Sequence, residues 1–357
     1  MRTLAIAPGR CLLGEGAVEE VGKLASGFGR RAIVFGGATA LKVAYERVAS
    51  ALDREGVVHT ARTFTGECSQ RQINMATEFF ADCSVAICVG GGKALDTGKA
   101  AAQLAGIACI TVPTSAATCA ACTALSILHT DAGEYNTGQL LDHCPEAMII
   151  DPKLIITAPS CLLAAGVADA FARATETELA AHAGLPNTNA ALSLGIGRGY
   201  CKEVLEEEAG PAFSACRAGR VTSEFESVVD ASILGAGVAS GLCGGFFQLN
   251  VAHAISYALT YFIQPEDALH GETVGLGILI QRFLEDSSGR RLARTRQQFA
   301  EWRLPLTFRA IKLSEVTGKI GWTLARRAYM YLDQKHAVPF SVTEENLFQA
   351  IAAVENY

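Results

Sequence analysis

The sequence predicts an α/β domain built on a doubly wound parallel sheet, followed by a helical domain. Between Arg31 and Asp151, short apolar runs alternate with helical segments over short links, which is the pattern of a parallel sheet covered on both faces. From Pro159 onward, the segments keep helical periodicity and no β-branched runs separate them. We therefore place the domain boundary near Ile155, between residues 1–155 and residues 156–357.

The elements of the first half follow from apolar runs and turn residues. The run Arg31–Phe35 predicts a strand that ends at Gly36 and Gly37. Thr123–His129 and the turn Asp131–Glu134 indicate a hairpin inserted near the sheet edge. The other predicted elements are a helix over 39–53, a strand over Val57–Phe64, a helix over Gln70–Ala81, strands over Val85–Val89 and Ala108–Val112, a helix starting at Lys93, and a last strand over Met148–Asp151.

The second half predicts long helices separated by prolines. The three clearest helical segments are Leu162–His182, Asn187–Leu205 and Ser223–Gly241. Proline interrupts a helix because it lacks the backbone N–H. We therefore expect Pro159, Pro186 and Pro211 to fall between helices.

Composition excludes several function classes. The chain has 357 residues, half of them hydrophobic, and a formal net charge of −6, which argues against the basic face that a nucleic-acid-binding protein needs. No apolar run reaches the roughly 18 residues that span a bilayer, and the first residues do not resemble a signal peptide. We expect a cytoplasmic protein with no membrane partner.

The cysteines support the same compartment. There are 12, scattered through the chain and often in apolar segments, which indicates reduced buried thiols rather than a disulfide framework. Cys119 and Cys122 form a single C-x-x-C pair, which can be a redox dithiol or half of a zinc site. A second C-x-x-C, which would strengthen the zinc interpretation, is absent from the sequence.

The turn after the strand Val85–Val89 is a candidate phosphate site. Gly90, Gly91 and Gly92 precede Lys93, where a helix starts, so backbone N–H groups can approach a phosphate at the positive end of that helix. The spacing matches neither G-x-G-x-x-G nor the P-loop motif. A tight turn without a ligand is the alternative interpretation.

Three polar residues in the second half could converge on a metal. Asp169 and His253 interrupt apolar helical stretches, and His270 opens His-Gly-Glu-Thr-Val-Gly. One carboxylate and two imidazoles make a three-ligand catalytic site with a position open for a substrate oxygen. The alternative is that each is a hydrogen-bonded polar group of the core.

These motifs together resemble a known family. Gly90-Gly91-Gly92-Lys93 with Asp96 and Lys99, then Pro113-Thr114-Ser115, then Asp169, His253 and His270 are similar to the glycerol dehydrogenase branch of the metal-dependent (iron-type) alcohol dehydrogenases. The segment Ala117–Ala121 is similar to the bacterial hydroxycarboxylate dehydrogenases of that family. The resemblance covers nearly the whole chain and joins motifs in both halves.

The resemblance implies a dinucleotide-binding domain, a helical metal domain, a cleft between them and a homo-oligomer. It implies that Asp169, His253 and His270 are the catalytic metal ligands. The cofactor-binding residues that it implies are Gly36, Gly37, Gly90, Gly91, Gly92, Lys93, Asp96, Thr114 and Ser115. Arg173 stands where iron-containing members carry a further His, which favours Zn²⁺, although Fe²⁺ also suits two His and one carboxylate.

Three departures from the family pattern bear on the ligands. Cys119 replaces an Asp that contacts polyols, and Arg173 adds a positive charge one helical turn after Asp169; both changes favour an anionic substrate. Gly36-Gly37 replaces the acid that holds the ribose in NAD users, which favours NADP(H) over NAD(H). Ser256 replaces a second His, which puts a proton relay at that position in doubt.

The predicted function is therefore interconversion of a small 2-hydroxycarboxylate and its 2-oxo acid by hydride transfer. A glycerol or polyol dehydrogenase is the first alternative. A dehydroquinate-synthase-like lyase shares the implied architecture but needs a basic phosphate pocket, and we find no Lys/Arg cluster near the ligands in sequence. A non-catalytic nucleotide-binding relative is the third alternative, against which the intact Asp-His-His set argues.

Overall fold

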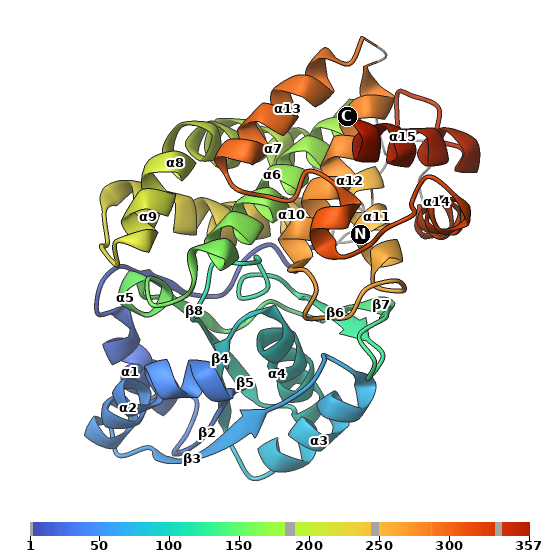
Figure 1. The fold of residues 1–357 in the computed structure, drawn as a ribbon. Helices are drawn as coiled ribbons and strands as arrows, with labels where there is room; N and C mark the ends of the chain where they lie inside the picture. Colours follow the sequence, from blue (N-terminus) through green and yellow to red (C-terminus); the bar gives the residue numbers. More distant parts are fainter. Residues whose placement is uncertain (1–2, 183–189, 244–249, 287, 333–337) are drawn as a thin grey trace.

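The computed structural model describes residues 3–182, 190–243, 250–286, 288–332 and 338–357 (Figure 1). Six parallel strands form one sheet in the order β1-β8-β5-β4-β2-β3. Their bounds are β1 Cys11–Leu13, β2 Arg31–Gly37, β3 Val58–Phe64, β4 Val85–Gly90, β5 Ala108–Pro113 and β8 Ala147–Ile150. The doubly wound parallel sheet that the sequence predicts is confirmed.

Helices cover both faces of this sheet because its central strand is apolar on both sides. In β4, Val85, Ile87 and Val89 join the core under α1 (Val21–Ser26) and α2 (Ala38–Arg54). Ala86 and Cys88 join the core under α3 (Gln70–Phe80) and α4 (Gly92–Ala105). Figure 1 shows the two helix pairs on opposite sides of the strands. A strand buried on both faces is typical of parallel sheets.

The strand order reverses between β2 and β4. The chain runs outward from β2 to β3, and then returns through β4 to β5 and β8 on the other side of β2. Gly36 of β2 lies beside Val89, and Gly90 of β4 lies beside Pro113, so these strands end at one edge of the sheet. Ligands of doubly wound folds bind outside the strand ends at such a reversal.

A two-stranded hairpin leaves the sheet and contacts the helical part. It pairs β6 (Leu125–His129) with β7 (Tyr135–Leu140) antiparallel, which confirms the predicted hairpin. The Tyr135 backbone N–H donates to Thr260 Oγ1 at 2.8 Å, and the Tyr135 ring stacks on Tyr257 with centroids 3.9 Å apart. The hairpin therefore joins the edge of the sheet to the helices (Figure 1).

Beyond β8, the described residues form helices and connections, and no strand follows Ile150 among them. This change, from alternating strands and helices to helices alone, is why we propose the domain boundary at residue 155. The helices are α5 Pro152–Ile155, α6 Ser160–His182, α7 Ala190–Ile196, α8 Glu203–Arg217, α9 Ser223–Asp230, α10 Ala236–Leu242, α11 Val251–Leu259, α12 His270–Glu285, α13 Arg290–Glu301, α14 Lys319–Tyr331 and α15 Glu344–Asn356. Short π-helical stretches over Gly197–Lys202 and Ala231–Gly235 join α7 to α8 and α9 to α10.

Two sequence expectations about this part are wrong. Pro211 does not separate helices but lies inside α8, and the segment expected to end at Leu205 continues to Arg217. Pro211 is exposed, so the carbonyl that loses its helical partner there can bond to water. Pro159 directly precedes α6 as expected, whereas Pro186 and Asn187 lie outside the described residues.

One helical stretch is long and apolar enough to be compared with a membrane span. It covers Ser223–Leu242, with a mean hydropathy of 1.2, and 67% of it is buried inside the fold. Phe225, Val228 and Val229 of this stretch belong to the main hydrophobic core. Burial of this kind is typical of a core helix in a globular protein.

Candidate active site

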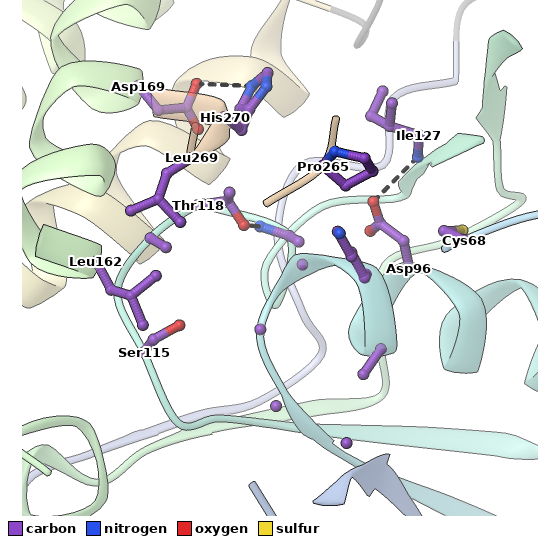
Figure 2. Close-up of a pocket in the computed structure, with 18 of the residues that line it drawn as sticks. Cys68, Asp96, Ser115, Thr118, Ile127, Leu162, Asp169, Pro265, Leu269 and His270 are labelled. Carbon is purple, nitrogen blue, oxygen red and sulfur yellow. Dashed lines mark hydrogen bonds and ion pairs between the residues drawn. The ribbon is translucent and has the colours of Figure 1, made fainter. Parts of the chain in front are cut away.

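Three helices bring Asp169, His253 and His270 together. Asp169 lies on α6, His253 on α11 and His270 on the first turn of α12. Asp169 Oδ1 is 3.2 Å from His253 Nε2 and 3.9 Å from His270 Nε2, and one ligand atom from each residue lies within 4.8 Å of the others. Figure 2 shows Asp169 and His270 pointing toward one another. Among the described residues, this is the one group of three or more His, Cys, Asp or Glu that could hold a metal.

Close backbone contacts fix the relative position of these helices. A Cβ on Gly271 would lie 1.8 Å from the carbonyl oxygen of Ala165, so α12 meets α6 next to His270. A Cβ on Gly277 would lie 2.2 Å from the carbonyl oxygen of Ala252, so α12 also meets α11 next to His253. Only glycine allows such approaches. The three candidate ligands therefore stand on a rigid frame.

The charges at this cluster favour an ionised carboxylate at Asp169 and a neutral imidazole at His270, whereas Glu176 and Asp169 raise the pKa of His253 against the opposing effect of burial. Burial opposes ionisation of Asp169, but the Arg173 guanidinium and the two imidazoles hold the pKa of Asp169 below its usual range. Burial, with the nearby positive groups, lowers the pKa of His270 to about 4. An ionised carboxylate and a neutral imidazole are the forms that ligate a divalent metal. The donor set fits Zn²⁺ or Fe²⁺.

Glu176 is a site residue that the sequence reasoning missed. It is fully buried on α6, and its Oε1 lies 2.8 Å from Nδ1 of His253 and 3.3 Å from the backbone nitrogen of His253. Asp169, Arg173 and Glu176 lie four and then three residues apart, so they share one face of α6. This spacing from Asp169 is the signal that could have identified Glu176.

Ser256 and Tyr257 complete the surroundings of the imidazoles. The Ser256 hydroxyl is 2.6 Å from Thr273 Oγ1 and 3.4 Å from His270 Nδ1. The Tyr257 ring has its centroid 6.1 Å from that of His253 and 6.3 Å from that of His270. Ser256 therefore contacts a candidate ligand but does not offer the imidazole that the resemblance leads one to expect there.

The cluster opens into a cavity that reaches the glycine turn. This cavity, of about 610 Å³, is lined by Asp169 and His270 at one end and by Gly90, Gly91 and Gly92 elsewhere. Ser115 and Thr118, labelled in Figure 2, also line this cavity. A Cβ on Gly92 would lie 3.2 Å from Thr118 Oγ1, so the turn faces the segment that lines the cavity opposite it. The cavity therefore joins the start of α4 to the candidate metal ligands.

The structure places the other predicted cofactor residues in two groups. The first group lines the cavity and consists of Gly37, Lys93, Asp96, Thr114 and Ser115. Gly36 does not line it; a Cβ on Gly36 would lie 2.2 Å from the carbonyl oxygen of Val89, so this glycine serves the pairing of β2 with β4. The roles of all these residues in cofactor binding stay predictions.

Two of the charged residues near the turn are engaged with protein groups. Asp96 Oδ2 accepts the backbone N–H of Ile127 at 3.0 Å, as Figure 2 shows, and Asp96 Oδ1 is 2.9 Å from Lys99 Nζ. Lys93 pairs with Glu67, which also lines the cavity. Asp96 therefore ties α4 to the hairpin, in addition to lining the cavity.

The two predicted substrate residues lie in the same cavity. Arg173 is buried with Nε 3.6 Å from Asp169 Oδ1, and the Asp169 carboxylate raises the pKa of Arg173 against the opposing effect of burial. Cys119 is 5% exposed, and burial raises the pKa of its thiol to about 11. The cavity beside the metal ligands therefore carries a guanidinium and a neutral thiol. The cysteines of the described part of the chain are free thiols, as expected.

Comparison with known proteins identifies the family. A family model for iron-containing alcohol dehydrogenase matches residues 8–152. Glycerol dehydrogenase of Escherichia coli O6:H1 is 30% identical over 98% of this chain and 96% of its own length. Hydroxycarboxylate dehydrogenase A of Escherichia coli K12 is 33% identical over 92% of this chain and 90% of its own.

A solved structure extends the similarity to the whole fold. The crystal structure of glycerol dehydrogenase from Schizosaccharomyces pombe has a TM-score of 0.90 and 26% identity, and the match covers 100% of this chain and 91% of that one. The sequence and structural similarities both run through the sheet and the helices. The chain therefore belongs to the iron-containing alcohol dehydrogenase family, a family of alcohol oxidoreductases.

Proposed function

We propose that this protein is a metal-dependent NAD(P)(H) oxidoreductase that interconverts a small 2-hydroxycarboxylate and its 2-oxo acid. The observation that carries the substrate class is the buried Arg173 guanidinium, which lines the cavity beside the Asp169, His253 and His270 cluster. An arginine offers paired N–H donors in the geometry that a carboxylate accepts. Membership of the alcohol dehydrogenase family favours this redox activity over a lyase.

In the proposed reaction, Asp169, His253 and His270 would hold the metal. A divalent metal in this position supplies Lewis acidity that polarises the hydroxyl or carbonyl oxygen of the substrate. Arg173 binds the substrate carboxylate and so orients the reacting carbon toward the cofactor part of the cavity. The donor set suits zinc or iron, and we propose zinc because Arg173 occupies the position where iron-containing members carry a third histidine.

We propose that the dinucleotide phosphates lie on the turn Gly90–Gly92. The turn lines the cavity at the start of α4, where free backbone N–H groups and the helix dipole favour an anion. At the end of β2 and just beyond it, the cavity is lined by Gly37, Ala38 and Thr39, none of which is acidic. Without a carboxylate there to repel a 2′-phosphate, NADP(H) is the favoured cofactor and NAD(H) the alternative.

Glycerol or another small polyol is the second candidate substrate. The specific observation that favours it is the glycerol dehydrogenase activity in the names of two of the similar proteins described above, whereas one is a hydroxycarboxylate dehydrogenase. Cys119 and Arg173 disfavour a polyol substrate. The hydroxyl groups of a polyol need a strong hydrogen-bond acceptor such as a carboxylate, and neither a neutral thiol nor a guanidinium provides one.

A substrate panel tests the proposal. Zinc-loaded protein is assayed for NADPH and NADH oxidation with 2-oxoglutarate, oxaloacetate and dihydroxyacetone, in the wild type, Arg173→Met and the exposed control Arg217→Met. Loss of a charged hydrogen bond to substrate costs about 1.5–3 kcal/mol, so we expect kcat/KM for the oxo acids to fall at least 10-fold in Arg173→Met. Reduction of dihydroxyacetone should change much less, and Arg217→Met should match the wild type.

The outcomes separate the two substrate classes. Oxo-acid turnover with NADPH that depends on Arg173 supports the proposal. Preference of the wild type for dihydroxyacetone, with equal losses for all substrates in Arg173→Met, would replace it with the polyol function and leave Arg173 a structural role. A cytoplasmic location and a homo-oligomeric state remain predictions alongside this proposal.

A further inference from the structure

We propose that Glu176 is a positioning residue for the metal site. In this role it orients His253 and supplies the negative charge that allows a divalent cation to bind beside Arg173. The inference rests on the metal site of the proposed function and adds a residue outside the three ligands. Glu176 is fully buried, its Oε1 holds His253, and its Oε2 has no hydrogen-bond partner among the described residues.

The first part of the role concerns the imidazole of His253. A carboxylate only accepts hydrogen bonds, so the contact at 2.8 Å places a ring proton of His253 on Nδ1. The other ring nitrogen, Nε2, faces the Asp169 carboxylate at 3.2 Å, so it is the atom left to ligate a divalent cation. Glu176 also contacts the backbone nitrogen of His253, so it fixes the start of α11 together with the ring. Metal-bound histidines commonly require such an outer carboxylate.

The second part concerns charge. Asp169 and Arg173 carry opposite charges 3.6 Å apart on α6, so the pair alone offers a cation little net attraction. Glu176 follows on the same face of α6 and makes the buried charge of the three residues negative. A carboxylate without a full set of hydrogen bonds in the protein interior is costly. That cost is offset when a divalent cation binds next to it.

Metal affinity tests the first part directly. Zn²⁺ dissociation constants are measured by chelator competition for the wild type, Glu176→Gln and Glu176→Ala, and Co²⁺ absorption spectra report the ligand geometry. We expect affinity to fall 10- to 100-fold, with Glu176→Ala weaker than Glu176→Gln, because glutamine keeps an acceptor oxygen but not the charge. The control is Glu178→Gln, on the same helix, where Glu178 pairs with Arg198 instead of the cluster. It should bind Zn²⁺ as the wild type does.

A double variant tests the second part. Arg173→Met combined with Glu176→Gln removes one charge of each sign from α6. If Glu176 acts by cancelling the charge of Arg173, the double variant binds Zn²⁺ more tightly than Glu176→Gln alone, because removing the guanidinium restores the net charge that the cation meets. A double variant that binds Zn²⁺ no more tightly than Glu176→Gln alone would overturn the charge-cancelling role, while a Zn²⁺ affinity of both Glu176 single variants equal to the wild type would overturn the whole inference.

The wild-type protein provides a further test, in which a variant serves only to assign the His253 signal. Histidine ¹⁵N chemical shifts of the Zn²⁺-loaded wild type, with the His253 signal assigned by its loss in His253→Asn, should show a proton on Nδ1 and the metal on Nε2. The Nε2–H form would contradict the inference. Failure of the wild type to bind Zn²⁺ at all would instead defeat the proposed metal site, so the two failures are distinguishable.

Discussion

At the scale of single residues, a buried lysine has the clearest structural role. The Lys99 side chain is 1% exposed, and its Nζ donates to the carbonyl oxygens of Ala120 and Leu125 at 2.7 Å and of Thr123 at 3.0 Å. It also pairs with Asp96. Its ammonium group therefore organises the loop between β5 and β6, which lines the cavity.

Replacement of this lysine should destabilise the fold. Lys99→Met leaves three carbonyls and the Asp96 carboxylate without their buried cation, and breaking one side of a buried ion pair typically costs about 3–5 kcal/mol. We expect the midpoint of urea unfolding, followed by circular dichroism, to fall accordingly. Lys23→Met removes an exposed lysine and should leave the midpoint unchanged. A midpoint for Lys99→Met equal to that of this control would show that the loop is held by other contacts.

At the scale of elements, a carboxylate on α9 gives the stability a pH dependence. Asp230 is the last residue of α9, and burial, followed by repulsion from Glu226, raises its pKa to about 6. A raised folded pKa means that the folded state binds the proton more tightly than the unfolded state. The contribution of Asp230 to stability is therefore lost as the pH rises from about 4 through about 6.

The variant Asp230→Asn should remove this dependence. Since Asp230 is partly exposed, solvent screening reduces the effect, and we expect about 1 kcal/mol of added stability at pH 8. Below about pH 4, both proteins carry a neutral side chain there, and the difference should vanish. Thermal melting of the two proteins at pH 4 and pH 8 measures this difference in stability. A difference that is the same at both pH values would mean that packing, not ionisation, distinguishes the side chains.

The strands and the first helices could be predicted from the sequence because local patterns determine them. The run Val85–Val89 is buried on both faces, and the helix after it begins where the glycines end. The strand β1 was missed because its three residues pair with β8, which is far away in sequence, and no local pattern indicates that pairing. Pro211 misled the prediction because exposure, which decides whether a helix tolerates proline, is not visible in the sequence.

The candidate site could be predicted only in part for a related reason. Asp169 and His253 are polar residues in apolar segments, and His270 opens a recognisable motif, so all three stand out in the sequence. Glu176 lies between two threonines and so does not stand out in the sequence, and its role depends on His253 of α11 lying opposite it. Asp96 was predicted as a cofactor-binding residue, but its contact with Ile127 was not, since that contact exists only once the hairpin has folded onto α4. Tertiary contacts of this kind leave no local signal.

At the scale of the whole molecule, the helical part meets the sheet through one very close backbone contact. A Cβ on Gly166 of α6 would lie 1.6 Å from the carbonyl oxygen of Ala116, in the segment after β5. Asp169 lies less than one turn further along α6, and Ser115 lies beside Ala116. This contact therefore sets the distance between the candidate metal ligands and the cofactor part of the cavity.

Gly166→Ala should damage stability and activity together. The added methyl cannot fit without displacing backbone, and overpacking of this kind costs about 1–3 kcal/mol. Because α6 moves away from the sheet, kcat should fall more than the affinity for Zn²⁺, whose proposed ligands all stand on α6, α11 and α12. Thermal melting, Zn²⁺ competition and turnover with the preferred oxo acid measure the three effects.

The matched control for this variant is Gly195→Ala on α7. A Cβ on Gly195 meets nothing within 4 Å, so alanine there should stabilise the helix by about 0.4–1 kcal/mol and leave turnover unchanged. Wild-type turnover in Gly166→Ala would show that the two parts tolerate a changed spacing. Equal losses of Zn²⁺ affinity and kcat would place the damage in the metal cluster instead. Only a loss of kcat at nearly constant Zn²⁺ affinity indicates that the alignment of sheet and helices sets the rate.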